Sequence, residues 1–237
     1  MNMEFYISII VGISQAFIFN PIDKAIYTSI INNNSFFDRS NWIKPFSGAS
    51  NGIYIKIITG GIYFYLIDYT KSLNMNVYQS SIVISSMTSL ILNPFNIIRF
   101  NSFIDNSSSL NSLRKIYQKN KLSFLKTGIE AFILRDFVFN MIYISSKKDN
   151  SSSIHNCGVI CAASIVSSPF HYIRNIKYYN PDKSYYNIYK DFIMEIKKNN
   201  KKTNFICQKF AIGIGTIRTI GSIYYGQIMY SSLKQFI

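Results

Sequence analysis

The chain has 237 residues, a formal net charge of +14, 48% hydrophobic residues and only 15% charged residues. This apolar content excludes a disordered basic tail, and the charged fraction is below the roughly 25% of an ordinary soluble domain. A basic chain with so few charges fits two classes of protein, a nucleic-acid binder or a membrane protein.

Six apolar segments are predicted to form long helices, in three pairs. In chain order they are residues 5–19, 48–66, 77–92, 128–145, 158–167 and 211–229. With their flanks they reach about 20 residues, which is enough to cross a bilayer. None is uniformly apolar, as expected for helices that line a watery cavity.

A short polar stretch separates the two helices of each pair, at residues 35–44, 109–121 and 185–202. In the third stretch, Tyr186 and Tyr189 share a face with Ile193, which predicts a helix lying on the membrane surface. These connectors carry many of the lysines, so the positive-inside rule places them on one side of the membrane.

A proline motif recurs at the end of the first helix of each pair. Its three copies, 20–26, 93–99 and 168–174, contain prolines that are 73 and 75 residues apart. Five, nine and thirteen residues before each proline, seven of the nine residues are Gly, Ala or Ser. Small residues at helical spacing let membrane helices approach closely. The sequence therefore predicts three repeats, residues 1–74, 75–150 and 151–237.

Three repeats in which a proline motif ends each odd helix resemble the mitochondrial carrier family, whose motif is Pro-x-acid-x-x-base, over essentially the whole chain. The resemblance implies an all-α membrane protein with six transmembrane helices in three pseudosymmetric repeats. Short surface helices would lie between the two helices of each repeat. The clipped loops and the many residues with AT-rich codons look like those of a divergent member encoded by a giant DNA virus.

The resemblance also implies a gate on the matrix side, where the prolines kink the odd helices. In the family the acid of one repeat pairs with the base of the next, so Asp23 is expected to pair with Arg99. Asn96 is expected to hydrogen-bond Arg174, whereas His171 would face Ile26 and leave the third link unmade. The residues of this matrix gate are Pro21, Asp23, Pro94, Asn96, Arg99, Pro169, His171 and Arg174.

A second gate, on the cytoplasmic side, is implied at the ends of the even helices. Its residues are Asp68, Lys71, Lys148, Tyr230 and Lys234. Only Asp68 and Lys71 keep both charges of the family pattern. Alternatively, Lys148 and Lys234 mark the membrane edge by snorkelling.

In the family, substrate binds on the even helices, seven residues after the glycine that opens each helix. The corresponding residues here, or their immediate neighbours, are Arg135, Asp136, Arg218 and Lys56. An arginine within an apolar helix is costly and is by default a functional-site hypothesis. Guanidinium groups suit phosphate and carboxylate, so the excess of basic residues predicts an anionic substrate.

The expected function is exchange of anionic solutes by alternating access, with no enzymatic step, catalytic residue, metal or cofactor. Nucleotides and deoxynucleotides such as ADP, dATP and dTTP are the favoured substrates, with amino acids and phosphate or carboxylates as alternatives. The expected partners are the solute and membrane lipids such as cardiolipin, without nucleic acid, and the chain is expected to act as a monomer. The expected location is the host mitochondrial inner membrane, or else a viral membrane.

Two readings from other classes stay open. Nucleic-acid binding would explain the charge through phosphate contacts, although the basic residues are scattered over connectors and helix ends. A structural membrane protein without transport would explain the helices but give no role to Arg135 and Arg218.

Overall fold

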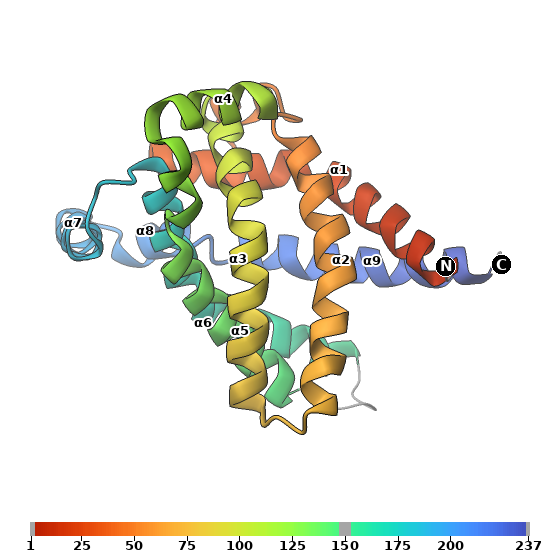
Figure 1. Ribbon diagram of the computed structural model, residues 1–237. Coiled ribbons are helices and arrows are strands. Elements are labelled where there is room, and N and C mark those ends of the chain that lie inside the picture. The colour runs from red at the N-terminus through yellow and green to blue at the C-terminus, as the bar shows by residue number, and fades with distance from the viewer. Residues whose placement is uncertain (1–2, 147–152, 236–237) are drawn as a thin grey trace.

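The computed structural model describes residues 3–146 and 153–235, and all regular elements within these ranges are helical (Figure 1). The all-helical class is therefore confirmed. The six predicted helical segments lie in or overlap the six long helices. These are α1 (Met3–Asn32), α2 (Ala49–Ser72), α3 (Val77–Ile104), α5 (Ile129–Ser146), α6 (Ser153–Tyr179) and α9 (Ile214–Gln235).

Short elements connect the long ones: η1 (Arg39–Trp42), α4 (Ser109–Asn120), η2 (Lys121–Lys126), α7 (Tyr185–Lys198) and α8 (Lys202–Lys209). Two of them, α4 and α7, match the predicted surface helices. The surface helix expected at residues 35–44 was wrong, because only the single turn η1 forms there. Asp38 starts this turn by accepting hydrogen bonds from the backbone and hydroxyl of Ser40, which lower the pKa of its carboxyl group. Extended backbone at Ile43 ends it.

The six long helices form a closed ring in which each helix contacts the next, in the order α1, α2, α3, α5, α6, α9 and back to α1. In Figure 1, α2, α3 and α5 run side by side, and α1 and α9 cross their direction. The first and last helices run antiparallel, because Gln15 bonds Ser222 while Asp23, farther along α1, contacts Arg218. α3 also touches both α1 and α6, so the odd helices approach one another.

Many polar side chains of the long helices are buried, and many of their large apolar side chains are exposed. Among the described residues, buried polar and charged side chains are at least as numerous as buried apolar ones. Ser81, Ser85 and Ser89, at three of the predicted small-residue positions, are fully buried on α3. The long helices expose large apolar side chains, including Ile10, Phe17, Ile82, Leu90, Ile217 and Ile228. Such exposure is compatible with a lipid environment.

Two helical stretches in the described part of the chain are long and apolar enough to cross a bilayer, Ile9–Asn32 and Val77–Ile104. The core helix of a soluble protein can meet the same criterion, so these two stretches are compatible with membrane insertion without requiring it. The six-span arrangement stays a prediction.

The helices approach closely at the predicted small residues. A side chain at Gly12 would place its Cβ 3.3 Å from the Cβ of Lys56, so α1 and α2 touch there. Ala16, on the same stripe, is 3% exposed. On α3, the hydroxyl of Ser85 accepts a hydrogen bond of 3.1 Å from Asn140 of α5. Small side chains therefore serve close packing on both helices.

The asparagine before the proline fastens the following loop in two of the three predicted repeats. Nδ2 of Asn20 donates to the carbonyl oxygens three and one residues before Gly48, at 2.9 and 3.0 Å. Nδ2 of Asn93 donates to the carbonyl oxygens at the same two places before Gly128, at 2.8 and 3.1 Å. Both glycines have left-handed backbone, with φ of 68° and 67°, which glycine adopts at no steric cost. The two segments therefore share one local design.

The third repeat lacks this clamp. Ser168 replaces the asparagine, and its hydroxyl donates to the Ile165 carbonyl of its own helix at 2.7 Å. Ala211 replaces the glycine yet keeps a left-handed backbone, with φ of 53°. This conformation costs an L-residue roughly 1–2 kcal/mol, so the loop before α9 is strained where its two counterparts are not.

Replacing Ala211 with glycine is expected to raise the free energy of unfolding by about 0.5–1 kcal/mol, because relief of strain exceeds the added entropy of the unfolded chain. Denaturant unfolding in detergent micelles would measure the change. The mirror substitution Gly128→Ala should destabilise the fold, since its Cβ would lie 3.0 Å from Tyr178 Cε1. If the Ala211→Gly variant were no more stable than the unchanged chain, the backbone at Ala211 would not be strained as we infer.

Candidate functional site

One buried carboxylate joins three helices at the centre of the ring. Oδ2 of Asp23 on α1 accepts from Nη2 of Arg99 on α3 at 2.8 Å and from Nη2 of Arg218 on α9 at 2.5 Å. The three side chains are 9%, 12% and 19% exposed. The predicted contact between Asp23 and Arg99 is therefore present. Arg218, which was assigned to the substrate level, meets the same oxygen atom.

Aromatic rings support both arginines of this carboxylate. The Arg99 guanidinium lies over Phe103 at 5.1 Å, and that of Arg218 lies over Phe19 at 5.4 Å. Among the described residues, the Nε atoms of Arg99 and Arg218 are buried without an acceptor. Each guanidinium therefore has a donor that Asp23 does not use, in surroundings where an unpaired donor is costly.

Lys56 on α2 adds a third cation near the carboxylate. It interacts electrostatically with Asp23, Arg99 and Arg218. We call these four residues the Asp23 cluster. The cluster contains three basic side chains and one acidic side chain, so it has an excess of positive charge that an anion would balance.

The predicted hydrogen bond between Asn96 and Arg174 is not formed in the described structure. Asn96 donates to the Leu92 carbonyl of its own helix at 3.0 Å, a local bond that short amide side chains readily make. Arg174 donates instead to the hydroxyl of Tyr27 at 3.2 Å, and its guanidinium lies over the Phe132 ring at 4.8 Å.

Tyr27 also makes the link that was expected to be missing between α6 and α1. Nε2 of His171 lies 3.2 Å from the Tyr27 hydroxyl, and the two rings are 5.4 Å apart. The expected neighbour, Ile26, is buried in an apolar cluster. One tyrosine hydroxyl thus contacts both His171 and Arg174, and the proline motif gave no signal for it because it lies one position beyond the motif.

The other two predicted substrate residues pair within α5. Nη1 of Arg135 lies 2.6 Å from Oδ1 of Asp136, and the Arg135 guanidinium lies over Phe139 at 5.6 Å. Their side chains are 32% and 14% exposed. The pair neutralises itself locally, so the net charge of the site comes mainly from the Asp23 cluster.

The predicted cytoplasmic gate is only partly within the described residues. Lys148 and the side chain of Asp68 lie outside them. Lys71 and Lys234 are exposed near the ends of α2 and α9, and Tyr230 is half-buried. This gate stays a prediction.

Lys24 is a structural residue that the sequence analysis missed. Its side chain is fully buried, and its ammonium group contacts the carbonyl oxygens of Ile43 and Lys44 and the side-chain oxygen of Asn106. A buried ammonium group needs such partners. Lys24 therefore fastens α1 to the loop after η1 and to the turn after α3.

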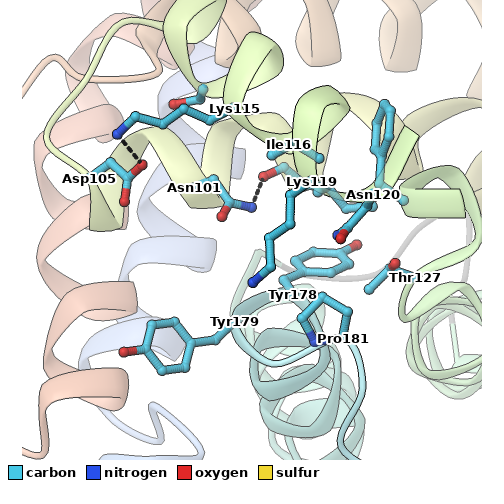
Figure 2. A pocket seen from close by; sticks show the side chains of 13 residues that line it. Asn101, Asp105, Lys115, Ile116, Lys119, Asn120, Thr127, Tyr178, Tyr179 and Pro181 are labelled. Carbon is cyan, nitrogen blue, oxygen red and sulfur yellow. Dashed lines mark hydrogen bonds and ion pairs between the residues drawn. The ribbon is translucent and has the colours of Figure 1, made fainter. Parts of the chain in front are cut away.

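A cavity of about 230 Å³ lies away from the Asp23 cluster, at the end of α3 against α4 and α6. Figure 2 shows Lys119 reaching into it above Tyr178 and Pro181, and the ion pair between Lys115 and Asp105 lies beside it at 3.0 Å. None of the predicted substrate residues lines this cavity. Within the described residues, no group of three or more metal-ligating side chains occurs.

A desolvated cluster with more positive than negative charge can bind an anion and can change its internal contacts when it does so.

No protein-family model matches the chain, and no curated protein matches it.

Proposed function

We propose that the chain is a membrane transporter of the mitochondrial carrier type, which exchanges anionic solutes by alternating access. The observation that carries this proposal is the buried, positively charged Asp23 cluster inside a ring of helices with apolar outer faces. Ionisable side chains inside membrane helices occur chiefly along the paths of solutes and ions.

The local geometry supports a three-repeat architecture. The asparagine clamp of the first repeat recurs in the second, and left-handed backbone recurs at Gly48, Gly128 and Ala211. We assign α1 and α2, α3 and α5, and α6 and α9 to successive repeats. The helices that fall short of a typical spanning hydropathy would turn their polar face to the cavity and their apolar face to lipid.

In this proposal, the contacts among the odd helices form the matrix gate. Asp23 and Arg99 join α1 to α3, and the Tyr27 hydroxyl joins α1 to His171 and Arg174 of α6. One ion pair and hydrogen bonds to the neutral Tyr27 hydroxyl replace three ion pairs, so opening requires the separation of fewer opposite charges. A solute that binds the cluster would lower the cost of this opening.

Nucleotides and deoxynucleotides are the favoured solutes, because several phosphate charges match the excess of cations. A second candidate, an amino-acid carrier, is favoured by the Arg135–Asp136 pair, whose opposite charges suit a zwitterion. Phosphate and carboxylates are further alternatives. We place the transporter in the host mitochondrial inner membrane, with a viral membrane as the other candidate.

Reconstitution of the full chain into liposomes tests the proposal. Labelled ADP, dATP and dTTP are expected to enter only when the liposomes contain unlabelled nucleotide, because exchange needs a counter-substrate. Labelled amino acids and phosphate serve as comparison solutes. Uptake of amino acids alone would replace the nucleotide assignment, and absence of uptake for all solutes would contradict a transport function.

A further inference from the structure

The Asp23 carboxylate occupies the place of an anionic ligand. Arg99 and Arg218, from different helices, both donate to its Oδ2 atom, at 2.8 and 2.5 Å. Charge-assisted hydrogen bonds of this kind are the ones that guanidinium groups make with bound phosphates and carboxylates. An anion that approached either arginine would therefore have to displace a carboxylate that is already bound.

The displacement is difficult because this carboxylate is held in position. Asp23 follows Pro21 within α1 and is buried. Asn20 beside it is fully buried, bonds two loop carbonyls and accepts from the same nitrogen of Arg99 at 3.1 Å. Well-oriented intramolecular groups act like free groups at very high concentration, often far above 1 M. A singly charged ligand at millimolar concentration cannot match that.

A ligand with more charge has further partners. The Nε donors of Arg99 and Arg218 are without acceptors in the described structure, and Lys56 is near both arginines. The single negative charge of the Asp23 carboxylate does not balance the positive charges of Arg99, Arg218 and Lys56. A ligand with two or more negative charges could replace the carboxylate and also pair with the remaining donors.

We infer that Asp23 is a specificity-determining residue, a tethered competitor that excludes monoanions from the Asp23 cluster and admits ligands with at least two negative charges. The inference rests on the proposed function only in that the cluster binds anions. Ligand entry would remove one contact between α1 and α3 and one between α1 and α9, because both contacts share the displaced oxygen. Charge selection and gate opening would then be one event.

Titration calorimetry of the full chain in detergent micelles tests the inference with inorganic pyrophosphate and acetate as probes. The unchanged chain is expected to bind pyrophosphate and to show no binding of 50 mM acetate. Asp23→Asn, which removes the competing charge, is expected to bind pyrophosphate at least about tenfold more tightly and to bind acetate measurably.

The matched control is Asp105→Asn, which changes the net charge equally at an exposed ion pair with Lys115. Its affinities are expected to stay within about twofold of those of the unchanged chain. The unchanged chain could bind pyrophosphate while Asp23→Asn binds it no more tightly. That result would overturn the inference that Asp23 competes with the ligand, but it would be consistent with an anion site. Absence of pyrophosphate binding in every variant would overturn the anion site, and the inference with it.

Asp23→Asn leaves buried cations without their carboxylate and could therefore fail to fold. A second pair of variants tests the inference in that case. Arg99→Gln and the double variant Asp23→Asn with Arg99→Gln both keep Arg218 and differ only in the competitor. The double variant is expected to bind pyrophosphate more tightly than Arg99→Gln. Equal or weaker binding by the double variant would overturn the inference.

Discussion

Liposomes that contain Arg218→Gln protein are expected to lose anion exchange, with initial uptake of labelled nucleotide at least about 100-fold below that of the unchanged chain. The expected loss follows from the buried position of Arg218 and its contact with Asp23 at 2.5 Å. A desolvated charge-assisted contact is worth about 3 kcal/mol or more, which corresponds to about 100-fold in rate. Asp23 keeps Arg99 as a partner in this variant, so the chain should still fold.

Arg114→Gln is the matched control for this experiment. It removes the same charge from the exposed surface of α4 and is expected to retain uptake close to that of the unchanged chain. Arg218→Lys should retain part of the activity, because it keeps the charge but loses the planar fork of the guanidinium. Full exchange by Arg218→Gln would make the Asp23 cluster a purely structural feature and would require that the solute binds elsewhere in the chain.

Replacement of Lys24 with methionine is expected to lower the free energy of unfolding by about 3 kcal/mol or more. Methionine has a similar length but cannot donate, so the carbonyls of Ile43 and Lys44 and the side chain of Asn106 would lose a buried partner. Each unsatisfied buried group costs about 1–3 kcal/mol. Denaturant unfolding in micelles, followed by circular dichroism, would measure the loss.

The control for this substitution is Lys115→Met, at an ion pair in which the lysine side chain is 63% exposed. Exposed pairs contribute about 1 kcal/mol or less, so this variant is expected to be nearly as stable as the unchanged chain. If Lys24→Met were no less stable than Lys115→Met, Lys24 would not be the fastening that we describe.

The helices could be predicted because the chain repeats its apolar segments and its proline motif. Hydropathy alone did less well, since in the described residues only α1 and α3 contain stretches that are apolar enough to qualify as spans. The other four long helices are recognised by their place in the repeat. The connector at residues 35–44 was mispredicted because the hydrogen bonds that Asp38 accepts from Ser40 start only a single turn, which extended backbone at Ile43 ends.

The contacts of the site were harder to predict than its residues. Counting from a glycine locates Arg218 along α9, but it does not reveal that Asp23 on α1 is its partner. Tyr27 was missed because one residue along a helix corresponds to a rotation of about 100°. The motif therefore selected Ile26, whose side chain packs in an apolar cluster. Asn96 was assigned a distant partner, but its side chain bonds its own helix.

The helices α1 and α9 are neighbours in space, but they are the first and the last helix in chain order. We call their contact the α1–α9 joint, and it is the one joint of the ring that no loop bridges. Side chains hold this joint, through Gln15 and Ser222 and through Asp23 and Arg218. Such a joint can open sideways without stretching any connecting segment. A ligand that takes Arg218 from Asp23 removes one of the contacts that hold this joint, so solute binding would loosen the ring where no loop connects neighbouring helices.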